Sequence, residues 1–404
     1  MSLANELKKQ LDGWLGVPLV QALRIGDRLL LRRPAESPAP PRRILLIKLW
    51  GLGNLTMILP LVRALRDQLP EAELEFLTLE QNRGFLEGLP WIDRVHRFRC
   101  RGLLGSLRSL AGLAVRLRRR RFDLVLDFEQ FLKTTAILTR LSGARASAGF
   151  KTARQARHGL YSIEVEYDPK RHMASVFADL LRAAGFEPPP SPRLLVPRNA
   201  AAARRVKARL DAWHPERRPL VALHIGSGDN FTGRRWPAAS FARLADRLIQ
   251  ERDALIVFTG AGRERALIAD CRSRMRGPSI DAGGLFQIDE LIEFLARVDL
   301  LVSNDTAPVH LGSALEIDLI AIYGPNTPAL YGPLHRGARV FHAGLPCSPC
   351  ITNTNAKTSY CRRPVCMTSI DVDQVAAAAL SMLARPAARP VAPARLHPLV
   401  AERS

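Results

Sequence analysis

The stretch Ile44-Leu-Leu-Ile-Lys-Leu-Trp-Gly-Leu-Gly-Asn54 decides the fold. Its first six residues form a mainly apolar run that is short enough for a buried strand of a parallel sheet. The turn Trp50-Gly-Leu-Gly-Asn54 follows directly and opens a helical stretch at 55–69. Glycines in such a turn let backbone N–H groups and the N-terminus of a helix approach a polar ligand. The stretch therefore predicts a strand–turn–helix unit with a binding turn.

The same alternation of strand and helix runs along the chain. In the first half, strands are expected at 44–49, 74–78, 95–98 and 124–128, with helices at 55–69 and 103–120. Four prolines in Glu187-Pro-Pro-Pro-Ser-Pro192 then predict an interdomain linker. In the second half, strands are expected at 220–224, 255–258, 300–303 and 319–323. Such alternation is typical of parallel sheets, so we expect an α/β protein with two Rossmann-like domains.

A chain of 404 residues with 47% hydrophobic content is long enough for two cores. We expect an amphipathic extension and linker at 1–41, a first domain at 42–190, a second domain at 191–375, and a C-terminal helix with a tail at 376–404. The Pro-, Ala- and Arg-rich end of that tail is expected to be disordered. The carboxyl ends of both sheets should face one central cleft, where substrates would meet.

The formal charge of +21 predicts attraction to polyanions, which include nucleic acid, acidic lipid headgroups and phosphorylated substrates. An aromatic content of 6% and the lack of a recognisable reader motif argue against nucleic acid. No apolar run is long enough to span a bilayer, so a soluble cytoplasmic protein is expected. The amphipathic N-terminal segment suits either contact with a membrane surface or a helix packed on the body. The arginines at 116–121 are interpreted first as a solvated helix end, and contact with anionic lipid is the alternative.

The second half carries four particular motifs. Leu223-His-Ile-Gly-Ser227 and Phe258-Thr-Gly260 end strands, and Arg234-Arg-Trp-Pro237 leads into a helix. Ser303-Asn-Asp-Thr-Ala-Pro-Val-His310 runs from a strand end into a helix, whose first N–H groups suit a diphosphate. Together they predict a nucleotide site at the carboxyl edge of the second sheet.

With the Gly-Leu-Gly turn and a closing cysteine-rich segment, these motifs resemble glycosyltransferase family 9, the ADP-heptose:lipopolysaccharide heptosyltransferases, from about Ile44 to Val375. The resemblance implies the GT-B architecture, with a first domain for the acceptor and a second for the nucleotide sugar. It also implies inverting transfer of a sugar, by family default heptose from ADP-heptose, to a lipopolysaccharide-core or related cell-surface glycan. By the same resemblance, neither a catalytic metal nor a cofactor is expected to be required.

The resemblance implies a set of donor-binding residues. They are Ser227, Arg234, Arg235, Thr259, Gly260, Glu264, Asp305, Thr306, Ala307 and His310. A departing nucleoside diphosphate gains negative charge, which helix N–H groups and guanidinium donors stabilise.

The acceptor-side loop, Gly51, Gly53 and Asn54, departs from the family, which has Asp where this chain has Asn54. An amide orients a hydroxyl but does not remove its proton. We therefore expect Glu129, with Asp127 as second candidate, to act as the base. The alternative is that these carboxylates cap the following helix or face solvent.

Four cysteines, Cys347, Cys350, Cys361 and Cys366, have a C-x2-C, x10, C-x4-C spacing close to that of tetrahedral zinc sites. A structural zinc is one interpretation, and cysteines without metal are the other. Two further functions stay open: a degenerate protein that binds a nucleotide sugar without transferring it, and a nucleotide-sugar epimerase.

Overall fold

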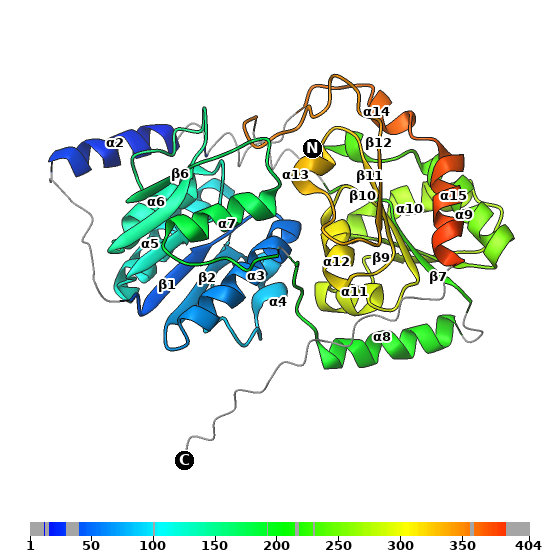
Figure 1. The fold of residues 1–404 in the computed structure, drawn as a ribbon, viewed down its shortest axis with the longest axis horizontal. Coiled ribbons are helices and arrows are strands. Elements are labelled where there is room, and N and C mark those ends of the chain that lie inside the picture. Colours follow the sequence, from blue (N-terminus) through cyan, green and yellow to red (C-terminus); the bar gives the residue numbers. More distant parts are fainter. Residues whose placement is uncertain are drawn as a thin grey trace, which may run out of the picture.

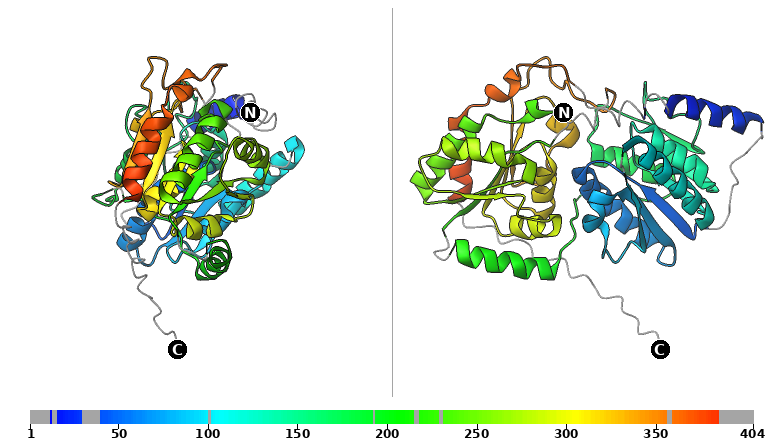
Figure 2. Two further views of the ribbon diagram at one scale, coloured as in Figure 1. Left: turned by 90° about the vertical axis from the view of Figure 1, so that its right-hand side faces the viewer. Right: turned by 180° about the vertical axis from the view of Figure 1, so that it is seen from behind.

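The computed structural model describes residue 12 and residues 16–29, 40–99, 102–191, 193–214, 218–228, 231–355 and 359–384. Two α/β domains lie side by side, and each has its own parallel sheet (Figures 1 and 2). Most of the expected N-terminal extension, and the tail from residue 385 onward, lie outside the described residues. None of the described helices is long and apolar enough to cross a lipid bilayer.

The first sheet has six parallel strands in the order β3-β2-β1-β4-β5-β6. They are β1 (Arg43–Ile47), β2 (Glu73–Leu79), β3 (Arg94–Phe98), β4 (Leu124–Asp127), β5 (Ala146–Lys151) and β6 (Ile163–Glu166). In β1, Ile44 and Leu46 belong to the core that includes α3 and α7, while Leu45 and Ile47 belong to the core that includes α5 and α6. Because both faces are buried, β1 is a continuous apolar run, as the sequence indicated.

The helices of the first domain are α2 (Gly16–Leu29), α3 (Leu52–Gln68), α4 (Arg83–Leu86), α5 (Gly102–Arg120), α6 (Lys133–Ser142) and α7 (Met173–Ala183), with a 3-10 turn, η1 (Glu80–Asn82). Helix α2 packs against α6, which supports the packed-helix alternative for this part of the N-terminal segment. Asp12 accepts hydrogen bonds from the backbone of Lys133 and Thr134 at the start of α6.

The second sheet also has six parallel strands, in the order β12-β11-β10-β7-β8-β9. They are β7 (Leu220–His224), β8 (Leu255–Gly260), β9 (Ile280–Gly283), β10 (Leu300–Asn304), β11 (Leu319–Tyr323) and β12 (Ala338–His342). The helices are α8 (Ala200–Trp213), α9 (Ala238–Arg252), α10 (Arg265–Ser273), α11 (Ile288–Leu295), α12 (Ala307–Leu315), α13 (Pro328–Tyr331), α14 (Val365–Thr368) and α15 (Val372–Leu383), with η2 (Thr232–Arg234) and η3 (Gly262–Glu264). The predicted GT-B architecture of two Rossmann-like domains is confirmed.

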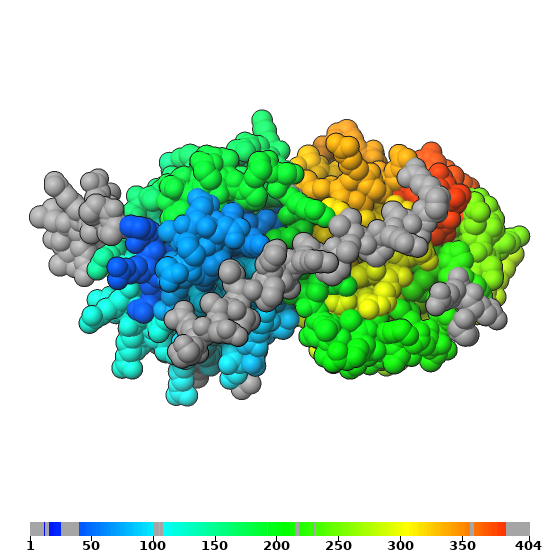
Figure 3. Space-filling model, turned by 60° about the horizontal axis from the view of Figure 1, so that its bottom comes forward, coloured from blue at the N-terminus to red at the C-terminus, as the bar shows by residue number. Residues whose placement is uncertain are grey.

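The two domains contact each other through α3 with α12 and α4 with α11. Figure 3 shows the two bodies in space-filling form. Helix α15 packs against α9, so the described part of the expected C-terminal segment packs as part of the second domain. The exact domain boundaries stay a prediction.

Candidate active site between the two domains

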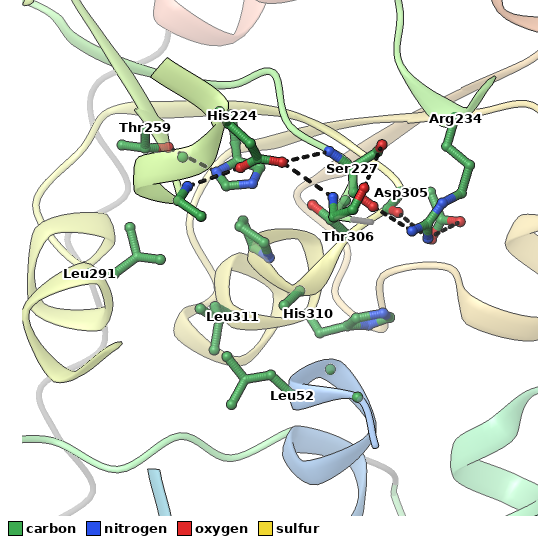
Figure 4. Close-up of a pocket in the computed structure, with 18 of the residues that line it drawn as sticks. Leu52, His224, Ser227, Arg234, Thr259, Leu291, Asp305, Thr306, His310 and Leu311 are labelled. Atoms are coloured by element: carbon green, nitrogen blue, oxygen red, sulfur yellow. Dashed lines mark hydrogen bonds and ion pairs between the residues drawn. The ribbon is translucent and has the colours of Figure 1, made fainter. Parts of the chain in front are cut away.

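A cleft of about 500 Å³ lies where the two domains meet. The first domain contributes the turn Gly51–Asn54 at the start of α3. The second contributes the residues that follow β7, β8 and β10, together with side chains of α11 and α12 (Figure 4). The predicted acceptor-side loop and the predicted donor segment therefore line one space.

The N-terminus of α12 forms one wall of this cleft. Thr306 is the extended residue before the helix, and Pro308 occupies its first turn, where the missing N–H costs no helical hydrogen bond. Arg234 donates to the carbonyl of Asp305 at 3.0 Å and also to the carbonyl of Ser227. Because N–H groups at a helix start and a guanidinium group both favour anions, this wall suits a diphosphate.

Two asparagines that the sequence analysis did not assign to the site hold this wall in place. Asn304 is fully buried; its Oδ1 accepts from the Trp236 backbone at 2.9 Å and its Nδ2 donates to the carbonyl of Ile225 at 2.9 Å. Asn326 donates to Asp305 Oδ2 at 2.9 Å. Strand-end asparagines are common, so only their tertiary partners reveal this role.

Glu264 organises the opposite side of the donor half. Its Oε1 accepts from the backbone N–H groups of Ser227 and Gly228, both at 3.2 Å, and its Oε2 accepts from that of Ala261 at 2.9 Å. Burial opposes ionisation, but these N–H groups and the field of His224 outweigh it and lower the pKa of Glu264. The carboxylate thus joins the loops after β7 and β8.

His224 and Thr259 meet behind that carboxylate, with His224 Nδ1 3.1 Å from Thr259 Oγ1. Burial lowers the pKa of His224, and the charge of Glu264 offsets part of this effect. All predicted donor residues line the cleft except Arg235, whose Nε donates to Ser227 Oγ at 3.1 Å. Arg235 is placed to orient Ser227.

The acceptor-side turn requires glycine at two positions. Gly51 has φ 91°, a backbone conformation that residues with a side chain rarely adopt. A Cβ atom built on Gly53 would overlap the His310 ring at Cδ2 and lie 3.0 Å from its Nε2. The glycine turn therefore lets α12 of the second domain approach the first domain closely.

Glu129 does not line the cleft, and its side chain is fully buried. Its Oε1 accepts from the backbone N–H groups of Leu49 and Trp50, both at 2.8 Å, and its Oε2 accepts from Lys48 Nζ at 3.0 Å. A general base must come within hydrogen-bond reach of the proton it removes. The structure thus does not support Glu129 as the base and places it beneath the acceptor-side turn.

Asp127 is also fully buried and outside the cleft lining. Its Oδ2 accepts from Arg157 at 2.7 Å and from the Tyr161 hydroxyl at 2.6 Å, and its Oδ1 accepts from the Glu129 backbone at 3.0 Å. Burial raises the pKa of Asp127, and the charge of Arg157 offsets only part of this rise. The alternative of a solvent-facing carboxylate is therefore wrong for both residues.

A structural zinc was one of the two interpretations of the cysteine segment. Among the residues that the structure describes, no three His, Cys, Asp or Glu side chains form a group that could hold a metal ion. Cys347 and Cys361 are exposed, whereas Cys366 is buried. The zinc interpretation is therefore not supported by the described part of the chain.

A polar contact joins the domains at the end of the cleft. Asn353, which is buried, places its Nδ2 2.7 Å from the hydroxyl of Tyr167 in the first domain and 2.9 Å from that of Tyr331 in the second. His172 Nε2 lies 3.0 Å from the carbonyl of Gly332. Tyr331 also lines the cleft, so Asn353 links a cleft residue of the second domain to Tyr167 of the first domain.

Comparison with known proteins gives a consistent picture. Residues 110–361 match the family model of glycosyltransferase family 9 (heptosyltransferase). Lipopolysaccharide heptosyltransferase 2 of Salmonella typhimurium is 30% identical over 126 residues, which cover 30% of this chain and 36% of the relative. Lipopolysaccharide heptosyltransferase 1 of Pseudomonas aeruginosa is 26% identical over 373 residues, which cover 85% of this chain and 99% of the relative.

The matches span only 36% to 50% of the length of three curated heptosyltransferases, namely the Salmonella protein and those of Campylobacter jejuni and Escherichia coli. Solved structures agree in fold. A glycosyl transferase family 9 protein from Veillonella parvula has a TM-score of 0.71 at 23% identity, covering 85% of this chain and 97% of its own. The ADP-heptose lipopolysaccharide heptosyltransferase II of E. coli has a TM-score of 0.69 at 18% identity, covering 84% and 98%.

Proposed function

Because the chain belongs to glycosyltransferase family 9, the heptosyltransferases, we propose that it is an inverting glycosyltransferase. It moves a sugar, by family default heptose, from a nucleotide diphosphate sugar to a lipopolysaccharide-core or related glycan acceptor. One observation carries this proposal: the N-terminus of α12 and Arg234 face the Gly51–Asn54 turn of the other domain across one cleft. A donor held by the second domain would thus present its sugar to an acceptor held by the first.

In this proposal the diphosphate of the donor, ADP-heptose by family default, lies against Thr306, Ala307 and Arg234. The negative charge that develops on the leaving diphosphate is stabilised there by N–H groups and a guanidinium group, without a metal ion. The nucleoside lies toward Thr259 and Glu264. Apolar side chains on that side of the cleft suit the face of a base; they are Ala282, Phe286, Ile288, Leu291 and Leu311.

A lipid-linked acceptor would bring the protein to the inner face of the plasma membrane, and we propose peripheral contact there. The support is electrostatic: the chain carries a net charge of +21, and Arg116 and Arg119 are exposed on α5. Helix α2 adds exposed apolar area, with Leu19 41% and Ile25 60% exposed. Basic and apolar groups together favour an anionic membrane surface.

The test is a panel of ADP-, GDP-, UDP- and dTDP-sugars, titrated by calorimetry and then incubated with a lipopolysaccharide truncated in its core. We expect one nucleotide sugar to bind and its sugar to appear on the acceptor. Binding without transfer to any acceptor would identify a degenerate binding protein, and a changed sugar without acceptor would identify an epimerase. Failure to bind any of the four would overturn the donor site.

A further inference from the structure

The acceptor hydroxyl must lose its proton during transfer, and the described residues that line the cleft offer four groups of suitable chemistry. They are the carboxylates of Glu264 and Asp305 and the imidazoles of His224 and His310. Asn54 itself has no basic group at neutral pH. The question is which of the four reaches the side of the cleft where the acceptor would lie.

Three of these groups belong to the donor side. Glu264 receives three backbone N–H groups from the loops after β7 and β8. Asp305 Oδ2 accepts a hydrogen bond from Asn326 and lies 3.7 Å from the Arg234 guanidinium group. His224 Nδ1 lies 3.1 Å from Thr259 Oγ1, on the side of the cleft away from the acceptor-side turn. Each helps to hold the donor wall together, and moving a proton there would disturb that wall.

His310 differs because it reaches across the cleft. It lies on α12, the helix that packs against α3, and its ring extends toward the N-terminal end of α3 (Figure 4). A Cβ atom built on Gly53 would overlap His310 Cδ2 and lie 3.0 Å from both Cγ and Nε2, so the ring edge at Cδ2 faces the backbone of the acceptor-side turn, with Nε2 next to it. Asn54 is the next residue along the turn.

We propose that His310 is the general base of the transfer, replacing the carboxylate that this chain lacks at Asn54. The step rests on the proposed function and goes beyond placing His310 at the donor. The acceptor oxygen forms a bond to the anomeric carbon, and its proton passes to His310 Nε2. The bond from that carbon to the diphosphate breaks, and the nucleoside diphosphate leaves with the electron pair.

Two residues, Asn54 of the turn and His310 of α12, then act on the acceptor hydroxyl. The Asn54 amide orients the acceptor hydroxyl, since it both donates and accepts hydrogen bonds. His310 removes the proton, and Gly53 is glycine because only its lack of a side chain lets the imidazole reach that point. This pairing explains how the donor helix and the acceptor-side turn form one reaction centre only when the domains are together.

The test compares His310→Gln with the wild-type chain, using ADP alone for calorimetry and the active donor with truncated lipopolysaccharide for turnover. We expect kcat to fall about 100- to 10,000-fold, the usual contribution of a general base, while Kd for ADP changes less than about threefold. Adding Asn54→Asp to His310→Gln should restore at least about tenfold of the lost kcat, because it returns a carboxylate to the turn.

Three outcomes would overturn the proposal: unchanged turnover in His310→Gln, a loss of ADP affinity as large as the loss of kcat, or no rescue by Asn54→Asp. Since His310 is buried, Gly53→Ala serves as a second variant. Its methyl group moves the imidazole without changing the chemistry of the ring, so kcat should fall while the affinity for ADP is retained. A wild-type chain that transfers no sugar would refute the proposed function, whereas an active wild type with an equally active His310→Gln refutes only the base.

Discussion

Lys48 Nζ lies 3.0 Å from Glu129 Oε2, and both side chains are shielded from solvent. The second carboxylate oxygen of Glu129 holds the backbone N–H groups of Leu49 and Trp50, where the chain leaves β1 for the glycine turn. A buried charge without its counter-charge strongly destabilises the folded state, because little water is present to solvate it. This ion pair therefore fixes the entry into the acceptor-side turn.

Glu129→Ala should lower the free energy of unfolding by about 3–5 kcal/mol, since it removes the carboxylate from a buried pair. Urea denaturation measures the change. Asp67→Ala, which breaks the exposed pair with Arg63, is the control and should cost at most about 1 kcal/mol. A well-folded Glu129→Gln that binds ADP normally but transfers no sugar would contradict this positioning role and restore Glu129 as a base.

Arg234→Gln should weaken ADP binding about 10- to 100-fold, because a hydrogen bond to a charged group contributes about 1.5–3 kcal/mol. The affinity of Arg234→Lys for ADP should lie between those of the wild type and Arg234→Gln, since Lys keeps the charge but lacks the planar guanidinium group. Calorimetry gives the three Kd values. The matched control is Arg243→Gln on the surface of α9, where the Arg243 side chain is 64% exposed and the variant should bind as the wild type does. Equal affinity of Arg234→Gln and wild type would remove Arg234 from the donor site.

His172 should make stability depend on pH. Burial lowers its pKa, although the hydrogen bond to the Gly332 carbonyl raises it in part. The unfolded chain takes up the proton near pH 6.5, and the folded chain only at lower pH. The unfolded state thus binds more protons in that interval, and the free energy of unfolding falls as pH decreases below about 6.5.

His172→Asn tests this contribution. Asn still caps α7, where His172 Nδ1 now accepts from the Ala174 backbone at 3.2 Å, but it does not titrate. Urea denaturation at pH 7.5 and 5.5 should show a smaller loss of stability in the variant, by at most about 1.4 kcal/mol per pH unit. An unchanged pH dependence would show that His172 protonates equally in both states.

Asn353→Ala should loosen the junction of the two domains. The variant removes the amide shared by the hydroxyls of Tyr167 and Tyr331, and a lost buried partner costs about 1–3 kcal/mol. Limited proteolysis at the linker after α7 and a thermal melt should both report the change. Tyr360→Phe, at a side chain 98% exposed, is the control and should leave both unchanged. If Asn353→Ala behaves like that control, the contact does not hold the domains together.

The central strands of both sheets were predictable because they are buried on both faces and so form continuous apolar runs. The strands that the sequence analysis missed are β5 and the sheet-edge strands β6, β9 and β12. The edge strands are only partly buried, as in β6 and β12, so polar residues interrupt their pattern. Local sequence carries no other strong signal for them.

The sequence by itself determined the two parallel sheets, the glycine turn and the helix start at Thr306, since strand, turn and helix signals act between near neighbours. It also placed the predicted donor residues in one cleft, apart from Arg235, because strand ends in a parallel sheet share one edge. Only the tertiary structure decided that Glu129 faces Lys48 inside the first domain and that His310 faces Gly53 across the cleft. Burial and close approach arise when distant segments pack, and a carboxylate or an imidazole has the same place in the sequence whether it ends in a core or in a cleft.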